Sequence, residues 1–203
     1  MHTIKKSFFS LFFILSSIDL ISQDIEEIIV KGNWRESKSI EQDSSIVILK
    51  NNILESQPVK HFENLSYLVP NLNFAASDSR ARHFQIRGIG ERSGYERTPN
   101  SAVGILIDDV DYSGQGGIAT TFDIDQVEVH RGPQGSRIGS NALAGLIYIK
   151  TKEPTPEYEG ITEITSGSYG TINAGIAFGG QSAYTQNLKY RLVLRQDYTD
   201  DIR

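Results

Sequence analysis

The sequence predicts an α+β domain with a small mixed sheet and short helices, followed by the first strands of a transmembrane antiparallel β-barrel that the 203 residues do not complete. Short apolar runs separated by Gly and Pro occupy the middle of the chain, as expected of small strands joined by turns. Beyond Pro156 apolar and polar residues alternate, which is the period of a strand with two different faces. With 38% hydrophobic residues, the chain lacks the series of apolar runs of about 20 residues that a helical membrane protein needs.

The composition removes several classes of function. A net charge of −5 argues against a nucleic-acid partner, because phosphate neutralisation needs clustered Lys and Arg in excess. The absence of Cys excludes disulfide scaffolds, thiol nucleophiles and cysteine-ligated zinc. No two of the four histidines stand at ligand spacing on one element, so we expect neither a bound metal nor a cofactor.

The first 22 residues have the pattern of a secretory signal peptide. Lys5 and Lys6 precede an apolar run over residues 8–15, and Asp19 interrupts the apolar character. The run is too short to span a bilayer, so export is a better interpretation than anchoring, and a buried first helix is the alternative. We place the cleavage near Ser22, and any later insertion into a membrane would have to use strands.

The next elements follow from composition and periodicity. Residues 25–30 are β-prone and residues 31–43 are polar without apolar periodicity, so we expect an unpaired extended segment on a tether. Residues 44–49 predict a strand. Between Pro58 and Pro70 apolar residues recur at three- and four-residue steps, which predicts a helix whose apolar face packs in the core.

Four further short strands complete the predicted α+β domain, which ends near residue 156. The first three end in glycine, aspartate or proline, the residues that turns with unusual backbone angles require. These strands cover residues 84–87, 103–107, 127–130 and 146–150.

Three alternating stretches follow, at residues 158–166, 172–178 and 188–194. A half-buried soluble sheet would show the same alternation, but an export signal ahead of the strands favours a barrel in a membrane. Three strands cannot close a barrel, and hydrocarbon does not tolerate an open sheet edge. We therefore expect a truncated chain that lacks most of its barrel.

Four motifs succeed one another along residues 24–198. They are Glu26-Glu27-Ile28-Ile29-Val30; Phe84-Gln85-Ile86-Arg87-Gly88; residues 103–109, a strand with an acidic turn; and residues 127–147, which contain Arg131-Gly132-Pro133. In type, order and spacing they resemble the N-terminal plug domain and first barrel strands of TonB-dependent outer-membrane receptors. Two departures are mild, since Ile138 stands where the family often has an aromatic residue and Tyr148 where it often has Asn.

The resemblance implies a domain plan and a function. It implies a signal peptide over residues 1–22, a TonB box and linker over 23–43, a plug over 44–156 and the first barrel strands over 157–203. The implied protein is a monomer in the outer membrane of a Gram-negative bacterium, in contact with lipid. It takes up a scarce ligand when TonB, powered by its inner-membrane complex, pulls on the plug. A ferric siderophore is the expected ligand, with cobalamin, haem or a glycan as alternatives.

The resemblance also implies roles for particular residues. The TonB box, Glu26 to Val30, would bind TonB by strand addition, in which main-chain hydrogen bonds supply the affinity. Arg87 and Arg131 would pair with glutamates on the barrel wall as a latch between plug and barrel, and Glu128 would join that network.

Ligand contact would come from two loops at the apex of the plug, residues 89–101 and 111–117. Arginine and tyrosine side chains suit an anionic, partly aromatic ligand through charge and stacking, and Arg80 and Arg82 extend the positive run. The candidate ligand-binding residues are Arg92, Tyr95, Arg97, Tyr112 and Gln115.

Three alternatives bear on this interpretation. An enzyme would have to use Asp108, Asp109 and Asp111 as catalytic carboxylates or residues 88–90 as a phosphate loop, but turn formation explains the aspartates and the third glycine of that loop is absent, so we expect no enzyme. A soluble secreted β-rich binding or adhesion module is a second alternative, which membrane extraction would separate. A signalling receptor with an extra N-terminal domain is a third, and the short distance from residue 22 to Glu26 disfavours it.

Overall fold

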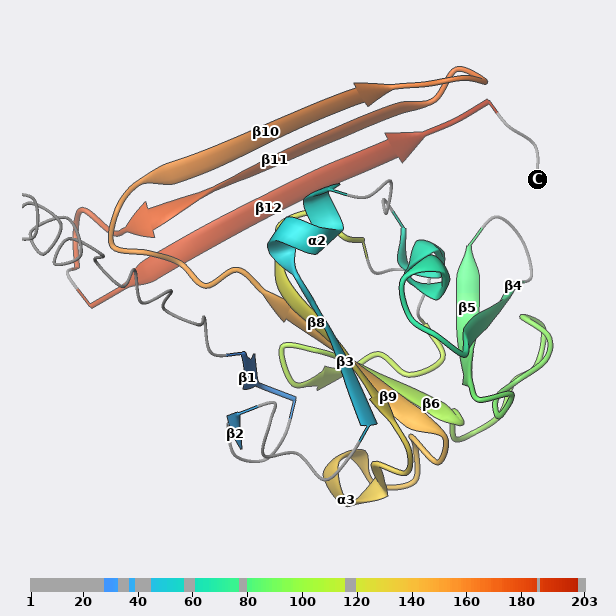
Figure 1. Ribbon diagram of the computed structural model, residues 1–203. Helices are drawn as coiled ribbons and strands as arrows, with labels where there is room; N and C mark the ends of the chain where they lie inside the picture. Colours follow the sequence, from blue (N-terminus) through green and yellow to red (C-terminus); the bar gives the residue numbers. More distant parts are fainter. Residues whose placement is uncertain are drawn as a thin grey trace, which may run out of the picture.

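The computed structural model shows a mixed five-stranded sheet with a separate three-stranded sheet beside it (Figure 1). The signal peptide, Glu26, Glu27 and Pro58 lie outside the described residues. Within the described part of the chain, no helix is both long and apolar enough to cross a membrane. The structure describes residues 28–32, 37–38, 45–56, 61–76, 80–115, 120–185 and 187–200.

The five-stranded sheet forms the centre of the α+β domain. Its order is β3-β8-β9-β6-β7, with β6 and β9 parallel and the other pairs antiparallel, which confirms the predicted small mixed sheet. The strands span β3 Ser45–Lys50, β6 Val103–Ile107, β7 Val110–Asp111, β8 Ile124–Arg131 and β9 Gly145–Thr151.

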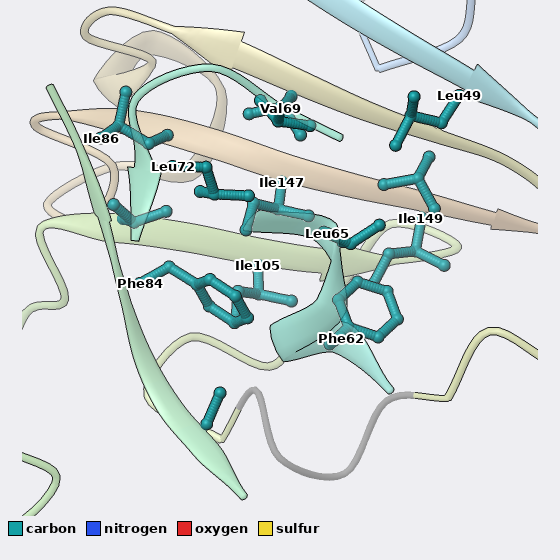
Figure 2. Packing of buried hydrophobic residues seen from close by; sticks show 14 of the residues in the cluster. Leu49, Phe62, Leu65, Val69, Leu72, Phe84, Ile86, Ile105, Ile147 and Ile149 are labelled. Atoms are coloured by element: carbon teal, nitrogen blue, oxygen red, sulfur yellow. The ribbon is translucent and has the colours of Figure 1, made fainter. Parts of the chain in front are cut away.

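One face of this sheet carries the main hydrophobic core, which Figure 2 shows. The helix predicted between Pro58 and Pro70 is a 3₁₀ helix, η2, over Phe62–Tyr67. Phe62, Leu65 and Val69, which the prediction placed on its apolar face, are buried. The hairpin of β4 (Leu72–Ala76) and β5 (Ala81–Ile86) completes the cover, and Phe84 and Ile86 lie in the core. Helix α2 (Asn51–Ser56) follows β3 directly.

The opposite face of the sheet carries a smaller cluster. Leu106, Leu146 and Tyr148 pack there against Ile138 of the short helix α3 (Gly135–Ile138). Gly104 lets Ile138 approach β6 closely, because a Cβ at position 104 would collide with the end of the Ile138 side chain. The rest of this face is covered by the N-terminal segment, in which β1 (Ile29–Val30) pairs with β2 (Ser37–Lys38). The expectation of an unpaired segment was wrong for Ile29 and Val30.

The last three strands form a sheet of their own with strongly polarised faces. Apolar side chains of β11 and β12, such as Ile176 and Leu192, are exposed on the face that points away from the α+β domain. Asn173 and Ala177 on the other face of β11 are buried, although the sequence of this face is the more polar one. The strands are β10 Glu159–Ser166, β11 Ile172–Gln181 and β12 Lys189–Tyr198, all antiparallel.

Candidate functional site

The N-terminal segment, residues 29–32, lies on the face of β8 opposite the main core. Gln126 Nε2 donates to the Ile29 carbonyl at 3.0 Å, and the Val30 side chain is fully buried. The backbone N–H groups of Lys31 and Gly32 donate to the two carboxylate oxygens of Glu128 at 2.6 and 3.0 Å. A hollow of about 440 Å³ opens beside Ile29 and Lys31, so one side of the segment can be reached from solvent.

Glu128 is a buried carboxylate whose partners are all donors. Besides the two backbone amides, it accepts from Gln126 Nε2 at 2.6 Å and from His130 Nε2 at 2.8 Å, and it has no exposed surface. Burial alone would raise the pKa of Glu128, but the hydrogen bonds from His130, from the Lys31 amide and from Gln126 outweigh it and hold that pKa below its ordinary value. Glu128 is therefore ionised at neutral pH.

The structure does not bring Glu128 to the arginines of the expected latch. Neighbouring residues of a strand point to opposite faces, so Glu128 shares its face with Gln126 and His130 and not with Arg131. The place of Glu128 in the arginine network stays a prediction, and the period of two in β8 is the signal that sets it on the other face of the strand from Arg131. The prediction overlooked the role that the structure gives Glu128, which is to bind the N-terminal segment.

The two arginines themselves lie at neighbouring strand ends. Arg87 is exposed just after β5, and Arg131 is half-buried at the end of β8. Gly145 is the register partner of Arg131, and a Cβ on it would meet Ile86 Cδ1 at 2.6 Å, so the two strand ends converge. Within the described residues, the buried Nε of Arg131 has no hydrogen-bond partner.

The two candidate ligand loops lie together. Arg82 joins them, since its Nε donates to the Gly114 carbonyl at 3.4 Å and an Nη donates to the Gly94 carbonyl at 3.2 Å. Glu91 holds the first loop from inside, because its buried carboxylate accepts from Thr98 Oγ1 and from the Ala102 amide, both at 3.0 Å. Arg82 thus joins residues 89–101 to the described part of the second loop, residues 111–115, and residues 116 and 117 lie outside the described residues.

Four of the five candidate ligand residues are exposed on these loops, and Tyr95 is 76% exposed. The exposed four are Arg92, Tyr95, Arg97 and Gln115. Tyr112 differs, because its half-buried ring packs against the main core. Arg80 and Arg82 do not extend a free positive run: Arg82 holds the loops, and Arg80 contacts His61 Nδ1 and lies 3.7 Å from Asp197.

A second junction, which the sequence interpretation missed, joins the α+β domain to the three-stranded sheet. Arg191 of β12 binds both carboxylate oxygens of Asp123 at 2.6 Å, and the two side chains are 6% and 1% exposed. Next to it, the Phe122 ring lies 5.5 Å from the Arg195 guanidinium and would meet a Cβ on Gly175 at 3.0 Å. The alternation of β12 shows which side chains face inward, but not that Asp123 receives one of them.

Comparisons with known proteins agree with this architecture. A family model described as the TonB-dependent receptor plug domain matches residues 38–146, more than half of the chain. The ferripyoverdine receptor of Pseudomonas aeruginosa is 26% identical over 125 residues, 61% of this chain and 15% of that protein. The pesticin receptor of Yersinia enterocolitica is 29% identical over 102 residues, 50% of this chain and 15% of that protein.

Solved structures share the fold. The ferric yersiniabactin uptake receptor FyuA of Yersinia pestis matches with a TM-score of 0.62 at 24% identity, over 70% of this chain and 22% of that chain. The ferripyoverdine receptor of Pseudomonas aeruginosa bound to ferripyoverdine matches with a TM-score of 0.68 at 17% identity, over 84% of this chain and 22% of that chain. The chain thus spans about 15% of the length of the curated relatives it matches.

Proposed function

The chain belongs to the family of TonB-dependent receptor plug domains, and on this premise we propose that it is the front part of an outer-membrane receptor that imports a scarce ligand. The observation that carries the proposal is the polarity of β10, β11 and β12 beside the plug. A soluble sheet turns its apolar face inward, whereas this sheet exposes Ile176 and Leu192 and turns Arg191 toward the plug. Lipid contact outside and a plug inside account for that inversion.

Energy for uptake would come from TonB, which would pull on the N-terminal segment of the plug. Residues 26–30 are proposed to bind TonB by strand addition. In the structure Ile29 and Val30 are paired over only two residues of β2, a ladder short enough to be exchanged for another strand. Ile28 and Ile29 are each 40% exposed, so the outer part of the box is accessible where it is described.

The plug would be seated by two sets of contacts. Asp123 and Arg191 join it to β12 within the chain. Arg87 and Arg131 are proposed to pair with glutamates on later strands of the barrel wall. The buried Nε of Arg131, which has no hydrogen-bond partner among the described residues, supports this, because a buried donor without an acceptor is costly until such a partner is present.

The ligand is proposed to be a ferric siderophore that contacts Arg92, Tyr95, Arg97 and Gln115. These side chains are exposed on two loops that Arg82 joins, and they suit an anionic chelate with aromatic groups. Receptors named for ferripyoverdine and for ferric yersiniabactin are among the similar proteins. Tyr112 is left out of this set, since its ring packs in the core.

Uptake by cells that carry the full-length receptor tests the proposal. Radioactive ferripyoverdine and ferric yersiniabactin serve as first probes, in cells with and without TonB, with surface binding measured in parallel. We expect accumulation only with TonB, and weaker binding when Arg92 or Tyr95 is changed to Ala. Lys152→Ala, away from the loops, is the control. Accumulation that is equal without TonB would contradict the proposal.

A further inference from the structure

We propose that Glu128, with Gln126 and His130, is a buried clasp that docks residues 29–32 on β8 and sets how readily TonB can draw the N-terminus out. The proposal rests on the function proposed above, since it concerns the accessibility of the same TonB box. Glu128 is a positioning residue in this scheme, and it acts through the backbone of the segment it holds.

The hydrogen-bond geometry of Glu128 is the first argument. A carboxylate has about four acceptor sites, and here four donors fill them. Two donors, Gln126 and His130, come from β8 itself and orient the carboxylate at 2.6 and 2.8 Å. The other two, the amides of Lys31 and Gly32, come from a segment nearly a hundred residues away in the sequence. Half of the bonding capacity of this buried charge is therefore used to hold the segment.

The fit at Gly32 is the second argument. A Cβ at this position would lie 2.6 Å from Glu128 Oε2, 2.6 Å from His130 Nε2 and 3.2 Å from Tyr148 Cβ. All three atoms belong to buried side chains, and two of them are hydrogen-bonded to each other, so they cannot move aside as the end of an exposed side chain could. Only glycine lets the backbone approach the carboxylate at 3.0 Å, and docking thus depends on residue 32 as much as on residue 128.

The position of the clasp is the third argument. Lys31 and Gly32 follow directly after the TonB box, so a pull on residues 26–30 reaches these two amides next after the Gln126 bond to the Ile29 carbonyl and the buried Val30 side chain. Undocking would leave a buried carboxylate with two of its four donors, and hydrogen bonds to a charged group are the strong ones. Release of the segment therefore requires enough free energy to break the two hydrogen bonds that Glu128 of β8 accepts from it.

The chain offers matched controls for each side of the clasp. Lys31 also reaches Asp125 through a side-chain ion pair of 3.1 Å, but those side chains are 27% and 44% exposed. Exposed pairs of this kind contribute little to stability. Asp125→Asn is thus the control for Glu128→Gln, and Lys31→Ala, which keeps its backbone N–H, is the control for Gly32→Ala.

Hydrogen exchange followed by mass spectrometry on the full-length receptor in detergent is the test. We expect a peptide over residues 28–33 to exchange at least about tenfold faster in Glu128→Gln and Gly32→Ala than in wild type, because one or both charge-assisted bonds are lost. The two controls should match wild type. Peptides from β9 report whether the sheet is intact, and Gly32→Ala decides the question if Glu128→Gln disturbs it.

Protection of residues 28–33 that stays within twofold of wild type in Gly32→Ala would overturn the clasp. This readout needs neither TonB nor ligand, so it is independent of the proposed function. Binding of the purified periplasmic domain of TonB is measured on the same samples. Faster exchange together with tighter TonB binding supports the full scheme, whereas faster exchange with no TonB binding in any sample sinks the proposed function and the part of this scheme that rests on it.

Discussion

Two buried carboxylates, one within β8 and one directly before it, bind distant parts of the chain. Glu128 binds the N-terminal segment through backbone amides, and Asp123 binds β12 through Arg191. In the sequence neither residue stands out from other acidic residues, and neither lies in the acidic turn at Asp108 and Asp109. What distinguishes them is the donors that surround them, which only the fold brings together.

Docking of the N-terminal segment should depend on pH through Glu128. Its pKa in the folded protein is lower than in an unfolded chain, where a glutamate titrates near roughly 4.3. The stabilisation is therefore complete above that value and is lost as the pH falls through the lower, folded value. Hydrogen exchange of residues 28–33, corrected for intrinsic rates, should show constant protection from about pH 7 to pH 5.

Acidification is expected to release the segment only below that interval. His130 is the one other titratable side chain that contacts the carboxylate, and Lys31 and Gln126 contribute an amide and a neutral side chain. Loss of protection between about pH 6 and pH 7, where an ordinary histidine titrates, would contradict the assignment to Glu128.

Removing the charge of Asp123 should destabilise the junction between plug and sheet. Asp123→Asn removes the bidentate partner of the buried Arg191, which keeps its ion pair with the half-exposed Glu159, and breaking a buried pair in this way costs about 3 kcal/mol. The free energy of urea unfolding of the full-length receptor in micelles measures the loss. Asp109→Asn, which removes an ion pair whose carboxylate is 71% exposed, should cost below about 1 kcal/mol. Equal effects of the two changes would rule out a special role for Asp123.

The regular elements were largely predictable, because they leave local signals. Turn residues and alternation located β6, β8, β9 and the three long strands, and the apolar steps before Pro70 located the buried face of η2. That helix is 3₁₀, a difference that side-chain spacing does not resolve over six residues, since residues three apart share a face in both helix types. Strand β7 was missed because it has only two residues, and β4 because its run ends in two alanines, which break the apolar–polar alternation and have low strand propensity.

The contacts between distant segments were not predictable. The pairing of β1 with β2 spans two residues each, and its support comes from Gln126 and Glu128, almost a hundred residues later. The partner of Arg191 is 68 residues away. Alternation assigns a side chain to a face of a strand, but it does not say which segment packs against that face. The Glu128 site and the Asp123–Arg191 pair both depend on contacts of that kind.

The outer face of β12 should lie in lipid and the inner face should not. Leu192 and Val193 are similarly exposed in the part of the protein described, at 47% and 42%, but Leu192 points away from the plug, whereas Val193 lines a hollow of about 280 Å³ against it. Nitroxide labels on Leu192→Cys and Val193→Cys, in the full-length receptor in liposomes, should differ in their accessibility to oxygen, which concentrates in lipid. We expect high oxygen accessibility at position 192 and low oxygen accessibility at position 193. Water-like accessibility at Leu192 would favour a soluble β-rich module instead.

At the scale of the whole molecule, the plug has two kinds of attachment. Asp123, Phe122 and the proposed arginine latch seat it against the barrel wall, while the clasp at Glu128 holds the only part that TonB is proposed to grasp. In the first kind, Asp123 and Arg191 form a bidentate ion pair between side chains, whereas the second holds the backbone amides of two residues. Under a pull from the N-terminus, the segment over residues 29–32 should come away before the plug leaves its seat.

The central claim, that residues 26–30 couple this receptor to TonB, is tested most directly by the ratio of uptake to surface binding in cells that carry Ile29→Pro. Proline removes a backbone donor and fixes the φ angle, so strand addition at this position fails, whereas Ile29→Val keeps both. The account predicts normal binding of radioactive ferric ligand by the proline variant, with uptake reduced to the level of cells that lack TonB. Normal uptake by Ile29→Pro would contradict it.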